Sequence, residues 1–101
     1  MRKVVQYRTK TNRADENQAL IEKVFGELDS ARPEGLRYAS LRMNDGVSFL
    51  HIAEIDTPHG SNPLAATAAF TEFQRDLADR CEVQPHAVDA TIVGNYGLLA
   101  G

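Results

Sequence analysis

The chain has 101 residues, of which 43% are hydrophobic and 25% are charged, and its formal net charge at pH 7 is −3. This size and composition predict one globular domain over residues 1–101 and argue against a disordered chain. The acidic balance disfavours a nucleic-acid partner, because binding to phosphates requires clustered Lys and Arg. The sequence shows neither a signal-peptide pattern nor an apolar stretch long enough to cross a bilayer, so we expect a cytoplasmic protein with no membrane partner.

The first third of the chain predicts a strand and then a helix. Residues 3–9 carry Val4, Val5 and Tyr7 in a short run that is typical of a strand. Hydrophobic residues recur at helical spacing over residues 20–28. Asn12 is a suitable residue to cap this helix, and the helix should end before Pro33, because the residue before a proline avoids helical geometry.

The middle of the chain predicts a β-hairpin. Residues 36–42 and 47–55 are expected to be strands, and the Asp45-Gly46 pair between them favours a tight turn in which both residues have positive φ. A two-residue turn at this point fixes the cross-strand register. It pairs Ser40 with His51 and Tyr38 with Ala53.

The last part of the chain predicts a loop, a second helix and a final strand. Asn62 and Pro63 are typical of a helix start, and hydrophobic residues continue at helical spacing as far as Cys81. Thr67 can cap a new turn, so the helix is expected to break near residues 66–68. Residues 87–96 predict the last strand, and residues 97–101 a frayed tail.

The element order βαββαβ predicts an α+β, ferredoxin-like fold. Its right-handed crossovers give a four-stranded antiparallel sheet with both helices on one face. The segment VSFLHIAEI, residues 47–55, is apolar on both of its alternating faces, so the other face of the sheet also needs cover. In so short a chain a second copy can supply that cover, which predicts a homodimer.

The expected register sorts the hairpin residues onto two faces of different chemistry. One face is largely aliphatic, and we expect it to pack on the helices; it collects Arg37, Ala39, Leu41, Leu50, Ile52 and Glu54. The other face mixes polar and aromatic groups, as a ligand pocket does. It collects Tyr38, Ser40, Arg42, Phe49, His51 and Ala53.

His51 and Tyr38 are the candidate catalytic residues. A neutral imidazole can take up a proton near pH 7, and a phenol can hold a ring oxygen by a hydrogen bond. The candidate ligand-binding residues are Ser40, Phe49, Tyr7 and Arg42. The alternative is structural: a buried histidine satisfied by Ser40 or by a backbone group, tyrosines packed at half-buried positions, and a solvated Arg42 near the hairpin tip.

No metal site is expected. His51 and Glu54 stand near Asp56 and His59, but an odd spacing along a strand points the first two side chains to opposite faces. The sequence also lacks the motifs of nucleotide binding and of nucleophilic hydrolases.

The element order, the Asp45-Gly46 hairpin followed by VSFLHIAEI, and the segment NPLAATAAFTEFQRDLADRC resemble the antibiotic-biosynthesis-monooxygenase family of dimeric α/β barrels. The resemblance covers nearly the whole chain. It implies a homodimer whose two sheets face each other and close a barrel, with a ligand cavity either between the sheet and the helices or within the barrel. Some members oxidise phenolic or quinol-like substrates with dioxygen and no cofactor, others degrade haem, and many have no known activity.

The chain departs from the active members of that family in two respects. It contains no Trp, and residues 63–80 contain no His at the usual position of a haem ligand, which disfavours haem degradation. The resemblance therefore implies a cofactor-independent monooxygenase acting on a small aromatic substrate. A dimeric module that binds a small molecule or another protein without catalysis is the alternative.

An RNA-binding module has the same element order. Gly46, Phe49 and Leu50 match part of the aromatic motif of such modules. Asp45 stands where the motif has a basic residue, and Val47 and Ile52 replace its other two aromatic residues, so an RNA-binding function is disfavoured.

Overall fold

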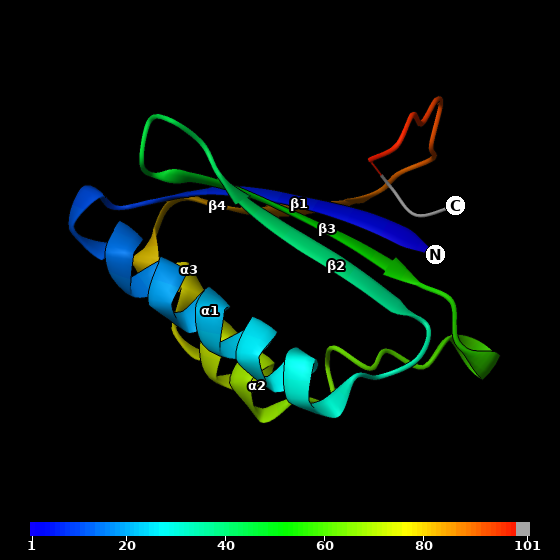
Figure 1. The fold of residues 1–101 in the computed structure, drawn as a ribbon. Helices are drawn as coiled ribbons and strands as arrows, with labels where there is room; N and C mark the ends of the chain where they lie inside the picture. The colour runs from blue at the N-terminus through cyan, green and yellow to red at the C-terminus, as the bar shows by residue number, and fades with distance from the viewer. Residues whose placement is uncertain (99–101) are drawn as a thin grey trace.

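The structure, a computed structural model, describes residues 1–98 and confirms the α+β, ferredoxin-like fold. The four antiparallel strands lie in the order β2-β3-β1-β4, and the helices lie together below one face of the sheet (Figure 1). The elements are β1 (Arg2–Thr9), α1 (Ala14–Ala31), β2 (Leu36–Arg42), β3 (Ser48–Ile55), α2 (Ala68–Arg75), α3 (Leu77–Arg80) and β4 (Cys81–Asp89), with 3-10 turns at Thr11–Arg13 and Pro58–Gly60.

The C-terminal tail and the helices bear on two further predictions, a frayed end and the lack of a membrane partner. The tail predicted over residues 97–101 lies mostly outside the described residues, and residues 97 and 98 belong to no helix or strand. Within residues 1–98, the helices are too short or too polar for any of them to span a membrane.

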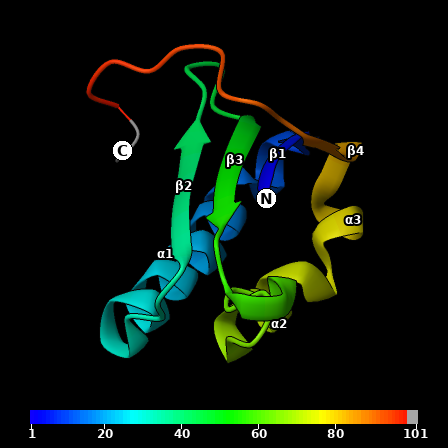
Figure 2. The ribbon, with the colours of Figure 1, turned by 90° about the vertical axis from the view of Figure 1, so that its right-hand side faces the viewer.

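The hairpin has the predicted register but a longer turn. Ser40 pairs with His51 and Tyr38 with Ala53, as expected, and Figure 2 shows β2 and β3 side by side. The Met43 N–H donates to the Ser48 carbonyl at 2.8 Å, so four residues form the loop instead of two. The predicted two-residue turn and the observed four-residue loop are both centred between Asp45 and Gly46. The strand register is therefore the same for both.

The longer turn also changes the backbone geometry expected at Asp45. Gly46 has a φ of 81°, whereas Asp45 does not have the positive φ that a two-residue turn requires. Instead, the Asp45 carboxylate accepts hydrogen bonds from the N–H groups of Val47 and Ser48 at 2.9 and 2.8 Å. These bonds hold the loop closed.

The face of the sheet that packs on the helices is the opposite of the one predicted. Phe49 and His51 are buried beneath the helices, whereas Leu41 remains 46% exposed on the open face. The reason is size: aromatic side chains bury more area than the aliphatic residues of the other face, and here they fill the space between sheet and helices. The stacked ring pairs include Phe25 with Tyr38 and Tyr7 with Phe49, and Phe73 lies against His51.

The helix boundaries match the sequence patterns in part. The predicted break is confirmed, because the Thr67 hydroxyl accepts the Phe70 N–H at 3.2 Å and α2 begins directly after Thr67. Asn62 accepts the Leu64 N–H at 3.0 Å, but it caps an isolated turn and not the helix. Asn12 lies inside a 3-10 turn and does not cap α1, which ends before Pro33 as predicted.

The last strand begins six residues earlier than predicted. Cys81 pairs with Thr9 of β1, so the apolar spacing that suggested a helix up to Cys81 belongs partly to a strand. The register shifts twice along β4, and Pro85 lies at the second of these irregularities, between Val83 and His86. An edge strand tolerates a proline there, because that position needs no ladder hydrogen bond.

The core lies between the aromatic face of the sheet and the helices. Phe73 is 4% exposed, whereas Phe25, Leu28 and Phe70 are half-buried and pack against the same cluster. Phe73 is therefore the residue on which we expect stability to depend most strongly.

Replacing Phe73 with Ala should lower the free energy of unfolding by about 3–5 kcal/mol, because the truncation removes buried area and leaves a cavity. Urea denaturation measures this loss. The matched control is Phe70→Ala, which should cost clearly less because Phe70 keeps part of its surface in solvent. A loss below about 1 kcal/mol for Phe73→Ala would show that α2 presents a different face to the sheet.

Candidate functional site

A cavity of about 320 Å³ lies between the helix-facing side of the sheet and the α2 region. Its walls are mainly apolar, and they include Leu64, Phe70, Phe73 and Leu77. Tyr7, Tyr38 and His51, from three different strands, bring their polar groups to the same cavity. Lys3, Asn62 and Gln74 also line it. An apolar enclosure with a few convergent polar groups is the usual form of a small-molecule site.

His51 lies at the centre of these polar groups and uses both ring nitrogens. Its Nε2 lies 2.7 Å from the Tyr7 hydroxyl, and its Nδ1 lies 2.6 Å from the Tyr38 hydroxyl and 2.8 Å from that of Ser40. The imidazole is 4% exposed, and burial lowers the pKa of His51 to about 4. His51 is therefore neutral at pH 7, and the near-neutral titration expected from the sequence is wrong.

Two buried residues that the sequence patterns did not single out support Tyr7. The Asn17 amide nitrogen donates to the Tyr7 hydroxyl at 2.9 Å, and the Arg80 Nε donates to the Asn17 Oδ1 at 3.0 Å. Arg80 also donates to the Phe73 carbonyl at 2.6 Å. A sequence signal did exist for Asn17, because it lies four residues before Ile21 and so falls on the buried stripe of α1.

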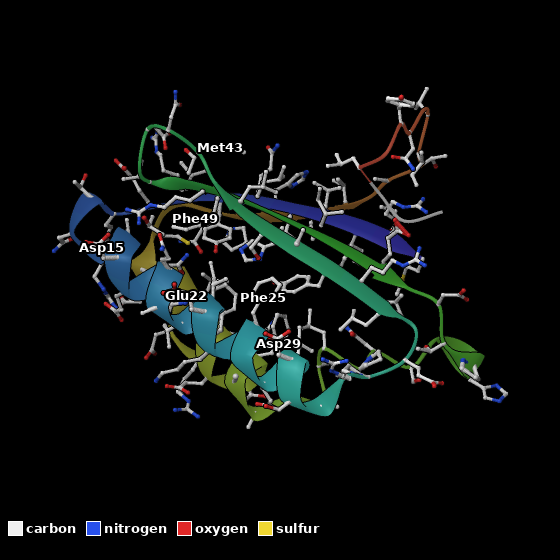
Figure 3. All side chains as sticks on the ribbon, viewed as in Figure 1. Asp15, Glu22, Phe25, Asp29, Met43 and Phe49 are labelled. Atoms are coloured by element: carbon white, nitrogen blue, oxygen red, sulfur yellow. The ribbon has the colours of Figure 1, made fainter. Side chains whose placement is uncertain are left out.

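The remaining predicted site residues are not all brought to the cavity. Ser40 does not line the cavity, and only its hydrogen bond to His51 connects it to the site. Phe49 is buried beneath Tyr7, where it packs against the ring at 5.5 Å, and Figure 3 shows it on the helix side of the sheet. Arg42 lies at the surface, where it donates to Asp15 and Gln18 of α1 at 3.1 and 2.7 Å.

The chemistry of the site follows from its lack of ionised acids. Burial raises the pKa of both Tyr7 and Tyr38, so the two phenols are neutral at pH 7. Within residues 1–98, no three His, Cys, Asp or Glu side chains are grouped as metal ligands. The side chains at the cavity can therefore hold an oxygen atom of a ligand by hydrogen bonds, with apolar walls around its carbon skeleton.

The lowered pKa of His51 predicts a stability that falls in acid. Unfolded His51 binds a proton near pH 6.5, whereas folded His51 does so only near pH 4, so the unfolded state gains protons first as the pH falls. Wild type should lose about 2 kcal/mol of unfolding free energy between pH 7 and pH 5 relative to His51→Gln. Urea denaturation at several pH values measures the difference. The exposed His86, replaced by Gln, is the control and should leave the wild-type slope unchanged.

The chain has no match among protein-family models and none in sequence among curated proteins. Its fold, however, is similar to several solved structures. A putative antibiotic biosynthesis monooxygenase from Nitrosomonas europaea superposes with a TM-score of 0.74 at 17% identity, over 95% of this chain and 92% of that one. Another from Bacteroides thetaiotaomicron gives a TM-score of 0.72 at 17% identity, over 100% and 95% of the two chains.

A third similar structure has a named activity. SnoaB from Streptomyces nogalater, a cofactor-independent oxygenase that was solved as a point mutant, superposes with a TM-score of 0.62 at 16% identity, over 93% and 96% of the two chains. At identities this low the comparison establishes the architecture and not the reaction. The chain therefore has the fold of the antibiotic biosynthesis monooxygenase proteins.

Proposed function

We propose that this protein is a cofactor-independent monooxygenase acting on a small, electron-rich aromatic substrate such as a phenol or quinol. The observation that carries the proposal is the apolar cavity in which Tyr38 and His51 are hydrogen-bonded to each other. The fold adds support, because one protein of similar structure is described as a cofactor-independent oxygenase.

The chemistry requires the substrate to supply the electrons. An ionised phenol transfers an electron to dioxygen far more readily than a neutral one. In the complete reaction one phenol and one dioxygen give one quinone and one water, so that one oxygen atom stays in the product and the other leaves as water. The protein has to favour the ionised substrate and exclude bulk water.

The residues of the cavity suit these two tasks. Tyr38 meets the substrate oxygen, and His51 holds the Tyr38 hydroxyl in place from behind. A hydrogen bond to a developing oxyanion stabilises it most strongly where water is excluded. Phe70 and Phe73 provide the apolar walls that pack against the aromatic ring. Because the substrate is its own reductant, we expect turnover without metal, haem or flavin.

A non-catalytic binding module is the second candidate function. It is favoured by the state of His51, whose pKa of about 4 and two occupied ring nitrogens make it a weak proton acceptor. In that case the same cavity holds an aromatic ligand without converting it. The two candidates differ in one measurable property, the consumption of dioxygen.

The activity is tested by dioxygen uptake over a panel of hydroxylated aromatics, with metal-stripped protein. Replacing Tyr38 with Phe removes only the hydroxyl that meets the substrate, and should lower turnover by about 100-fold. The control is Tyr96→Phe, because the Tyr96 ring is fully exposed and should leave the rate unchanged. Equal rates for both variants would exclude Tyr38 from the reaction. No turnover with any substrate would favour the binding module.

We also propose that the protein is a homodimer joined through the open face of its sheet. This face carries exposed apolar side chains from several strands, whereas the helices cover only the other face (Figure 1). Leu41 and Val88 are 46% and 42% exposed, and the half-buried Val4 and Ile52 lie between them. Covering these residues with a second copy removes apolar area from water.

The dimer predicts a mass twice that of the 11.1 kDa chain in sedimentation at micromolar concentration. Leu41→Glu places a charge on the open face and should shift the protein toward the monomer. Ala19→Glu, at an exposed position of α1, is the matched control and should leave the dimer intact. A wild-type monomer over the whole concentration range would contradict the proposal.

A further inference from the structure

The buried hydrogen bonds that lead from Arg80 to Tyr38 have a fixed direction. A guanidinium donates hydrogen bonds and accepts none, so the atom of Asn17 that faces Arg80 must be the amide oxygen. The amide nitrogen of Asn17 then faces Tyr7, to which it donates at 2.9 Å. Arg80 is 1% exposed and Asn17 is fully buried, so water does not compete for these hydrogen bonds and their direction is fixed.

The same direction continues through Tyr7 to His51. The Tyr7 oxygen accepts from Asn17, and within residues 1–98 its one other partner is the His51 Nε2 at 2.7 Å. The Tyr7 oxygen has a second lone pair and could accept an Nε2–H, but its own hydrogen would then have no protein acceptor within residues 1–98, although Tyr7 is only 4% exposed. Tyr38 is the more exposed of the two phenols, so the less costly arrangement places the Tyr7 hydrogen on Nε2, which then carries a lone pair. Neutral His51 then holds its proton on Nδ1, toward Tyr38 and Ser40.

A protonated Nδ1 leaves one hydroxyl hydrogen without an acceptor in this cluster. Tyr38 and Ser40 each bring a hydrogen, and neither can donate to a nitrogen that already has a proton. At most one of these two hydroxyl hydrogens can form a hydrogen bond between the Tyr38 and Ser40 oxygens. Tyr38 lines the cavity and Ser40 does not, so the arrangement that uses every donor has Ser40 donating to Tyr38 and Tyr38 donating into the cavity.

We propose that Arg80 and Asn17 are positioning residues that turn the Tyr38 hydroxyl hydrogen into the cavity and so make the site selective for an aromatic ligand with an acceptor oxygen. A phenolate or a quinone carbonyl fits this requirement, whereas a group that can only donate is rejected, because the Tyr38 hydrogen is then buried without a partner. The ligand class rests on the proposed function, but the direction of the hydrogen bonds does not.

The direction is tested by the tautomer of His51, which ¹H–¹⁵N correlation NMR of the imidazole reports directly. Wild type should show the proton on Nδ1. Asn17→Asp has nearly the same shape, but its carboxylate accepts from both Arg80 and Tyr7. The Tyr7 hydrogen is then drawn away from His51, and the proton should move to Nε2. A wild-type proton on Nε2, or the same tautomer in both proteins, overturns the proposal.

Two further variants keep the test decisive. Asn12→Asp, at an exposed position, is the matched control and should leave the proton on Nδ1. If Asn17→Asp fails to fold, Tyr7→Phe serves instead, because it removes the donor to Nε2 and should make the Nε2-protonated form visible. A spectrum of Tyr7→Phe identical to that of wild type overturns the proposal.

The ligand class is tested with two probes of the same shape, pentafluorophenolate and pentafluoroaniline, by calorimetry. The first presents an acceptor oxygen, and the second presents N–H donors at that position and has no oxygen elsewhere. Wild type should bind pentafluorophenolate at least tenfold more tightly, and Asn17→Asp should lose this preference. Equal affinities in wild type overturn the selectivity. The tautomer and the binding preference are both independent of dioxygen uptake, so a failure of the proposed oxygenase activity is distinguished from a failure of this inference.

Discussion

The packing of Phe73 against the aromatic side of the sheet is the interaction on which the rest of the structure depends. The Phe73 ring lies 5.6 Å from that of His51, and its backbone carbonyl and its ring both contact Arg80. This contact places α2 over the strands that carry Tyr7 and Tyr38. The core and the candidate site are therefore built by the same side chains, and a change to Phe73 affects both.

Burying so many polar groups beside an aromatic core is costly unless each has a partner. One continuous series of hydrogen bonds meets this requirement for all of these groups except the Tyr38 hydrogen, which points into the cavity. Arg80 is held by neutral acceptors, the Asn17 and Phe73 carbonyl oxygens, and by the face of the Phe73 ring. Because the Arg80 cation lies at one end of the series and the cavity at the other, the hydrogen bonds have one direction. In this way Arg80 of α3 orients the hydroxyl of Tyr38 on β2.

The two faces of the sheet serve different purposes. The aromatic face is closed by the helices and contains the cavity, whereas the open face presents aliphatic side chains such as Leu41 and Val88 to solvent. A face-to-face dimer would therefore leave the cavity of each chain on the outer side of the joined sheets, beneath its own helices. On this view the second copy stabilises the sheet, and the chemistry of the site belongs to each chain separately.

The sequence by itself determined the order of the elements, the register of the hairpin and the break at Thr67. Each of these depends on near neighbours: a turn centred on Asp45-Gly46, a capping hydroxyl, and periodic hydrophobic residues. Only the tertiary structure decided which face of the sheet packs on the helices, because both faces of β3 are apolar and the choice depends on the volume to be filled. It also decided that Cys81 begins a strand and that Asn17 and Arg80 meet, since both depend on contacts between residues far apart in the chain.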